Sequence, residues 1–106
     1  MSIGVYEMDA AGTVVYHKSM TDSRTNESEP NLIGRNFFDE IAAFQNFMDF
    51  RRRFKCFVGD SHPADEFNFD FYLREQILEI KVKLVRARER QDNKNSNLII
   101  VDIRKV

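Results

Sequence analysis

The chain has 106 residues, of which 42% are hydrophobic and 31% charged, and its formal net charge is −1. This length suits one domain with one core, and no apolar run approaches the roughly 20 residues that a membrane helix needs. A near-neutral charge disfavours a dedicated nucleic-acid binder, which normally carries a basic excess. Cys56 is the lone cysteine and no signal segment opens the chain, so we expect no internal disulfide and a cytoplasmic location.

Two strands are expected at the start of the chain. Ile3–Met8 and Thr13–His17 are rich in valine, tyrosine and isoleucine, and Asp9–Gly12 between them has the composition of a tight turn. This pattern predicts a β-hairpin. The polar stretch Lys18–Asn31 follows, and a stretch of this length is either a functional loop or a plain surface loop.

The middle of the chain is expected to be helical. Ile33–Phe47 leans towards helix, with Asn36 as a candidate cap for a short turn. Asp49–Val58 is a clearer helix, and Gly59 stands where such a helix ends. Apolar residues three and four positions apart predict one buried face of this helix: Phe47, Phe50, Phe54 and Phe57 or Val58.

The C-terminal half changes to a period of two. Apolar residues alternate with polar ones in Phe67–Leu73 and again in Ile80–Leu84, which predicts two strands with one face inward. Arg88–Asn97 is polar and predicts a hairpin loop before a last strand, Leu98–Val106. The order predicts an α+β domain in which short helices pack on one face of a five-stranded antiparallel sheet.

The motif around Gly34 resembles a known family. Leu32–Phe38, running on to Ala42, is similar to the "IGxNFFxxxA" core of the photoactive-yellow-protein branch of PAS domains, and the Phe67–Phe71 ladder and the terminal Val101–Val106 resemble that branch too. The resemblance implies a single PAS domain over residues 1–106. It also implies a sensory or protein-interaction module of bacterial-type signal transduction, and not an enzyme.

The resemblance also places the chromophore groups of the photoreceptors. Their hydroxycinnamoyl group is joined to a cysteine by a thioester, and a tyrosine and a glutamic acid hold its phenolate. In an ungapped alignment these three positions fall at Phe44, His17 and Thr21. Because position 44 lacks a thiol, and Cys56 lies in the predicted helix, we expect no such chromophore and no other cofactor.

A hypothetical ligand pocket is expected between the sheet and the helices. Its residues either line a cavity for a flat apolar ligand or fill it, and close packing of protein interiors favours filling. The candidates are Tyr6, His17, Thr21, Phe44, Phe69 and Phe71. Val15 and Ile33 are also expected on the inner side.

His17 is the most informative polar residue of this set. It could bind a ligand, sense pH or ligate haem iron, but a core histidine with a local hydrogen-bond partner is the simpler interpretation. In haem-binding PAS domains the iron ligand usually comes from the long helix, which has no histidine here. A second hypothesis remains: a cone-shaped α+β domain that binds or transforms an apolar ligand, with His17 and Asp22 as the base.

The outward face of the sheet is expected to bind a partner. Its apolar side chains would form a patch of a kind that soluble monomers rarely leave bare. The interface candidates are Val14, Tyr16, Val85, Leu98 and Ile100. In resembling domains an N-terminal segment or a second subunit covers this face, and the first strand here starts near Ile3. We therefore expect a homodimer or a partner signalling protein, with no nucleic acid and no membrane, unless Lys81, Lys83 and Arg104 shield the patch.

Other polar clusters give weaker signals. Arg51–Arg53 with Lys55 could contact phosphate or an acidic partner, although basic residues on an amphipathic helix are mostly its solvated face. His17, Cys56 and His62 do not have zinc-like spacing, so no metal site is expected.

Overall fold

The computed structural model describes residues 3–19, 31–60, 62–87 and 98–106. They form five strands, a π-helical turn (η1) and one α-helix. In chain order these are β1 Gly4–Met8, β2 Val14–Ser19, η1 Phe37–Ile41, α1 Phe47–Val58, β3 Ala64–Tyr72, β4 Ile77–Ala87 and β5 Leu98–Lys105.

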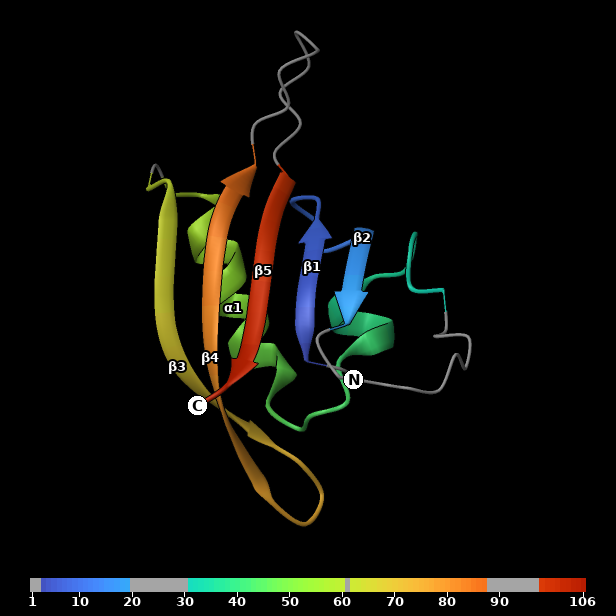
Figure 1. Ribbon diagram of the computed structural model, residues 1–106, viewed down its shortest axis with the longest axis vertical. Helices are drawn as coiled ribbons and strands as arrows, with labels where there is room; N and C mark the ends of the chain where they lie inside the picture. Colours follow the sequence, from blue (N-terminus) through green and yellow to red (C-terminus); the bar gives the residue numbers. More distant parts are fainter. Residues whose placement is uncertain (1–2, 20–30, 61, 88–97) are drawn as a thin grey trace, which may run out of the picture.

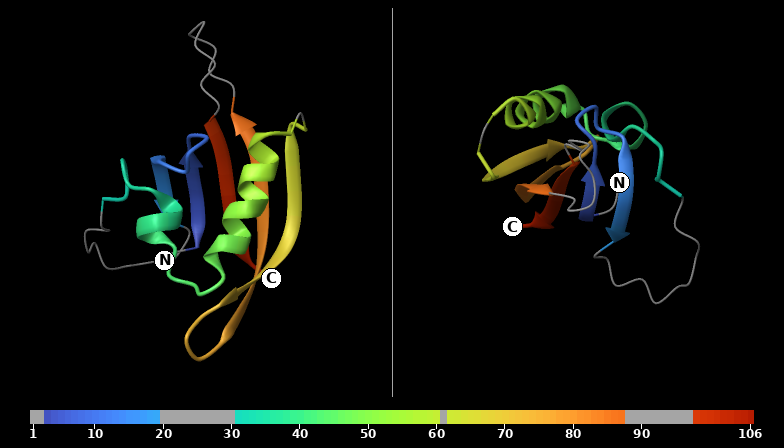
Figure 2. Two further views of the ribbon diagram at one scale, coloured as in Figure 1. Left: turned by 180° about the vertical axis from the view of Figure 1, so that it is seen from behind. Right: turned by 90° about the horizontal axis from the view of Figure 1, so that it is seen from above.

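The strands make one antiparallel sheet in the order β2-β1-β5-β4-β3 (Figure 1). The first and last strands pair at its centre, so the N-terminal hairpin and the three C-terminal strands share one layer. Seen from behind and from above, η1 and α1 lie on the same side of the sheet (Figure 2). The predicted fold class, an α+β domain with helices on one face of a five-stranded antiparallel sheet, is confirmed.

The β1–β2 hairpin turns on Asp9 and Gly12. The Asp9 carboxylate accepts hydrogen bonds from the backbone N–H groups of Ala11 and Thr13, both at 2.9 Å. Gly12 has φ of +91°, and a Cβ at this position would stand 2.8 Å from the ring of Phe38. Only glycine fits both the backbone conformation and this close contact, so the turn is locked against η1.

A β-bulge changes which residues of β2 face inward. The register shifts between Glu7 and Met8, so that Met8 lies opposite Val14 and Val15 becomes the extra residue. Val14 is therefore fully buried and Val15 is 41% exposed. The predicted orientation of both valines was wrong because a strict alternation cannot anticipate an inserted residue.

The helix-leaning segment before α1 forms only the short turn η1. The Asn36 side chain accepts hydrogen bonds from the N–H groups of Phe38 and Asp39 at 3.0 and 3.2 Å, which confirms the predicted cap. Its amide group also donates to the carbonyl of Ala11 at 2.9 Å, so one side chain joins the turn to the hairpin. Ile33 lies outside the turn and is 57% exposed, so its predicted inward position was wrong.

Helix α1 begins two residues before the predicted Asp49 and ends at Val58, before Gly59. Its buried face carries Phe50, Phe54 and Phe57. In the described part of the chain, no helix is long and apolar enough to span a membrane. The buried face of α1 shares one core with inward residues of the sheet, which include Ile80, Val82, Leu84, Ile99, Val101 and Ile103.

Candidate functional site

Residues that were predicted to line a pocket lie in an aromatic layer between the sheet and the helices. The rings of Phe44 and Phe71 stack at 3.8 Å between centroids and are 8° from parallel, so no ligand fits between them. Phe44 is 2% exposed and Phe71 is fully buried. Phe69 is half-buried beside them, 5.7 Å from Phe71.

The other end of the layer is built by Tyr6 and His17. They are opposite each other on β1 and β2, and their rings stack at 4.5 Å. Tyr6 is fully buried whereas His17 is half-buried, so the imidazole lies at the edge of the core, on its inner side as predicted. Thr21 and Asp22 lie outside the described residues, so the proposed pairing of Asp22 with His17 is not described.

Two phenylalanines that the site prediction left out connect these ends. Phe37 lies 5.0 Å from Tyr6 and 6.0 Å from Phe50. Phe50 is also 5.9 Å from Phe44 and 5.6 Å from Phe71. The position of Phe50 on the apolar face of the helix predicted that its ring is buried. It did not predict that the ring contacts both ends of the aromatic layer. Contacts between rings thus bring five of the predicted pocket residues into one layer: Tyr6, His17, Phe44, Phe69 and Phe71.

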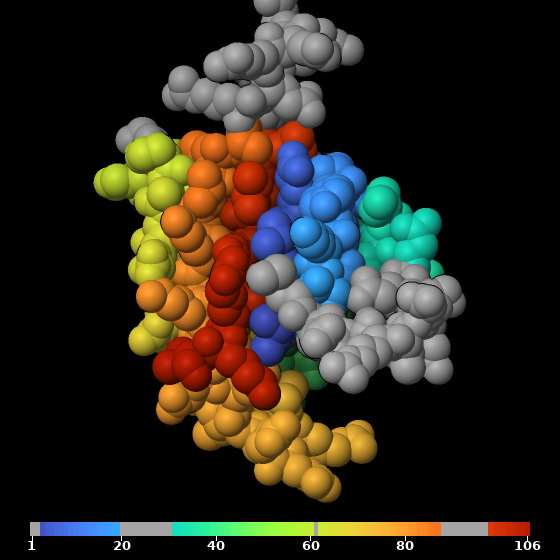
Figure 3. All heavy atoms as spheres, viewed as in Figure 1, coloured from blue at the N-terminus to red at the C-terminus, as the bar shows by residue number. Residues whose placement is uncertain are grey.

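On the outer face of the sheet, atoms of β4, β5 and β1 form part of the surface in Figure 3. Glu7, Ile100 and Val85 form one row across three strands. We call Tyr16, Val85, Leu98 and Ile100 the outer patch. Tyr16 is 48% exposed and the other three are half-buried. Val14, which was also predicted here, belongs to the core.

Two ion pairs border the outer patch. Lys81 lies 2.7 Å from a Glu66 carboxylate oxygen, and the Arg104 guanidinium donates to Asp102 at 2.9 Å. The hydrogen bond from Lys81, followed by the attraction of its charge, lowers the pKa of Glu66 below its usual value. The hydrogen bond to Asp102 likewise raises the pKa of Arg104. With Lys83, these four residues line a shallow cavity of about 280 Å³.

Arg86 on β4 holds the end of α1, a role that sequence reasoning missed. Its guanidinium donates to the backbone carbonyls of Phe57, Asp60 and His62, the last at 2.8 Å, and stacks on the Phe57 ring at 4.5 Å. Carbonyls at a helix C-terminus lack partners within the helix and attract a cation. An arginine near the end of a strand gave no signal of this contact in the sequence.

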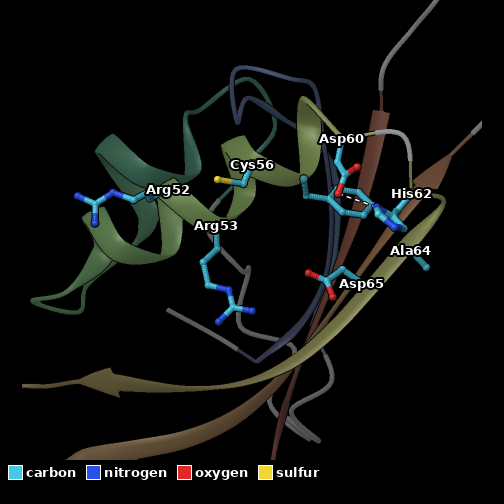
Figure 4. A pocket seen from close by; sticks show the side chains of 8 residues that line it. Arg52, Arg53, Cys56, Asp60, His62, Ala64 and Asp65 are labelled. Carbon is cyan, nitrogen blue, oxygen red and sulfur yellow. Dashed lines mark hydrogen bonds and ion pairs between the residues drawn. The ribbon is translucent and has the colours of Figure 1, made fainter.

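A second cavity, of about 420 Å³, opens between α1 and the start of β3 (Figure 4). Arg53 on the helix and Asp65 on the strand border it, and the Arg53 guanidinium lies 3.8 Å from the centre of the Phe67 ring. His62 shares a 2.6 Å hydrogen bond with Asp60. Among residues 3–19, 31–60, 62–87 and 98–106, no cluster of histidine, cysteine and carboxylate side chains could hold a metal ion.

Comparison with known structures assigns the class of the fold. The photoactive yellow protein domain of the sensor histidine kinase Ppr from Rhodospirillum centenum superposes with a TM-score of 0.69 at 24% identity, over 99% of this chain and 87% of that domain. The sheet order and the helices on one face are therefore those of a PAS fold. No family model matches the chain.

Sequence comparison then assigns the family. Photoactive yellow protein of Rhodothalassium salexigens is 30% identical over 89 residues, covering 82% of this chain and 70% of that protein. Photoactive yellow protein of Halochromatium salexigens is 26% identical over 87 residues, with the same coverage. The chain belongs to the photoactive yellow protein family, which confirms the predicted resemblance. Its single cysteine, Cys56, is exposed on α1 and does not point into the aromatic layer.

Proposed function

We propose that this chain is a non-catalytic sensory and interaction module of the cytoplasm that works without a hydroxycinnamoyl chromophore. In this proposal it signals through a homodimer or a partner protein bound to the outer face of its sheet. The relationship to a photoactive yellow protein domain of a sensor histidine kinase supports a sensory role. The stacked pair of Phe44 and Phe71 supports the absence of the chromophore, since it occupies space that a chromophore would need.

The absence of the chromophore can be tested by reconstitution. Purified protein is mixed with activated hydroxycinnamate, and we expect no absorbance band above the protein band because position 44 carries no thiol. Phe44→Cys supplies a thiol at this position and serves as the positive control for attachment. A new band in the wild-type protein would contradict the proposal, and its loss in Cys56→Ser would show that the thioester forms at that residue.

A homodimer over the outer patch is supported by its composition. Ile100 and Val85 face each other across β5 and β4, and two ion pairs, Lys81 with Glu66 and Arg104 with Asp102, lie further along the sheet. A two-fold axis brings the same surface together twice, so a patch with both charges can match itself. Stable interfaces bury about 800 Å² per partner, which is within reach of a five-stranded sheet.

Light scattering at tens of micromolar tests the homodimer. We expect a dimer for the wild-type protein and a monomer for Ile100→Glu, because the new carboxylate would be buried without a partner in the interface. Met48→Glu, which places the same charge on the exposed side of α1, is the matched control and should remain dimeric. A wild-type monomer, or equal dissociation by both variants, would refute the homodimer.

The proposed function needs no cofactor, and we expect that the protein does not bind haem. If haem were bound through the half-buried His17, the purified protein would show a Soret band that disappears in His17→Ala. We expect no such band, even after incubation with hemin.

A further inference from the structure

Positive charge is concentrated on α1. Residues 47–58 contain four cationic side chains and one acidic one, although the whole chain has a net charge of −1. The other residues of the chain therefore carry a net negative charge. A charge separation of this kind is not needed for the fold, because the buried side of α1 is held by phenylalanines.

Two exposed uncharged side chains, Met48 and Cys56, lie among the cations. Met48, Arg52 and Cys56 recur at intervals of four residues, so they share one side of the helix. Met48 is 53% exposed, and Cys56 is exposed too. Together with Arg51 and Lys55 these residues line a depression of about 410 Å³, which we call the basic face.

Among the described residues, the charges of the basic face are poorly matched. Arg52 lies 3.7 Å from Asp49 and Arg51 lies 3.8 Å from Asp39, both at the long end of ion pairing. The Nε atom of Arg51 is buried, and no residue in the described part of the chain accepts a hydrogen bond from it. Within the described ranges Lys55 has no ion pair. On the outer face of the sheet, by contrast, the cations of Lys81 and Arg104 are within 2.9 Å of carboxylates.

We propose that the basic face is a docking site for an acidic amphipathic segment of a partner protein. Carboxylates of that segment would pair with Arg51, Arg52 and Lys55, and an apolar side chain would lie against Met48 and Cys56. Arginine and methionine are enriched at protein interfaces, and charge complementarity selects the partner. Since α1 lies on the opposite side of the sheet from the outer patch, both surfaces can be occupied at once (Figure 2).

A protein segment fits this surface better than a nucleic acid. The carboxylates of Asp49, Asp60 and Asp65 border the cations along the helix and the neighbouring cavity. They would repel a continuous phosphate backbone, whose binding requires many phosphate contacts in a row. Met48 also offers apolar contact that a phosphate backbone cannot use.

The test uses a synthetic helical peptide with glutamates and leucines at helical spacing, labelled with fluorescein. Fluorescence anisotropy measures its binding to the whole chain, and amide chemical shifts locate it. We expect saturable binding that moves the resonances of Met48, Arg52 and Lys55, and a loss of about tenfold or more in affinity for Arg52→Glu/Lys55→Glu. The control Lys83→Glu/Arg104→Glu changes the net charge equally on the outer face and should bind the peptide with more than half the wild-type affinity.

A charge swap completes the experiment. A peptide in which lysine replaces each glutamate should bind Arg52→Glu/Lys55→Glu better than it binds the wild-type protein. The proposal is overturned if the acidic peptide does not bind or if both double variants weaken it equally. It is also overturned if an anionic vesicle or a DNA duplex binds the basic face more tightly than the peptide. The dimer measurement with Ile100→Glu is independent of all these outcomes.

Discussion

The two faces of the sheet are built on different principles. On the inner face, rings interlock: Phe50 lies within 6.4 Å of Phe37, Phe44, Phe67 and Phe71, counted between centroids. On the outer face, apolar side chains such as Ile100 are only half-buried and are bordered by ion pairs. The inner face thus has all its contacts within the chain, whereas the outer face leaves part of its apolar surface available.

The difference between the two faces indicates which parts of the fold can take on a new role in a family member. In the proposed function, a packed ring takes the place of the chromophore, and the fold is kept because close packing is kept. Signalling in this proposal depends on surfaces, because a core with no ligand offers no differential affinity between two states. Substitutions on each face test this contrast between a packed inner face and a partly exposed outer face.

Phe50→Ala should have the largest effect. The ring is 1% exposed and lies at the centre of the aromatic layer, so its loss leaves a cavity that neighbouring rings cannot fill. We expect the free energy of unfolding to fall by about 3–5 kcal/mol. Urea denaturation measures this, with Met48→Ala as the control, which should change stability by less than about 0.5 kcal/mol. Similar losses for both variants would show that the inner layer is not the main source of stability.

Arg86→Met should have the next largest effect. The substitution keeps an aliphatic chain against Phe57 but removes the donors to three carbonyls at the end of α1. We expect a loss of about 2 kcal/mol in unfolding free energy, and faster hydrogen exchange in the last turn of the helix. Arg104→Met removes an arginine whose ion pair is exposed, and should leave the midpoint of urea denaturation close to the wild-type value. An equal loss for Arg104→Met would disprove the special role of Arg86.

Removal of the ion pair between Lys81 and Glu66 should have the smallest effect on stability. Its folded pKa is lowered by Lys81, so the pair adds stability above the carboxyl pKa of the unfolded chain, and this contribution disappears as the pH falls through the lowered folded value. Lys81→Met should return the pKa of Glu66 towards its usual value, as measured by NMR titration of the side-chain carboxyl. An unchanged titration would mean that the two side chains do not pair in solution.

The sequence predicted the fold because the patterns that define it are local. Alternation in Phe67–Leu73 and Ile80–Leu84 and the phenylalanine spacing of α1 each indicate one buried face. Asn36 was identified as a cap because its side chain acts within three residues. These features need no knowledge of distant contacts.

The errors and omissions arose from contacts between distant segments. The bulge opposite Glu7 and Met8 places Val14 in the core. No residue type in β2 indicates this bulge in the sequence. Arg86 reaches carbonyls that lie 24 to 29 residues earlier in the chain, a contact that only the folded sheet creates. The role of the outer patch remains a prediction, because it depends on a second molecule.

Intermolecular NOE spectroscopy on a mixture of isotope-labelled and unlabelled protein tests the central claim most directly. If the outer face of the sheet is the signalling surface, methyl groups of Val85, Leu98 and Ile100 should show contacts to protons of the second chain, and the methyl group of Met48 should show none. Contacts that involve only α1, or none from the outer patch at concentrations where light scattering detects a dimer, would contradict the account.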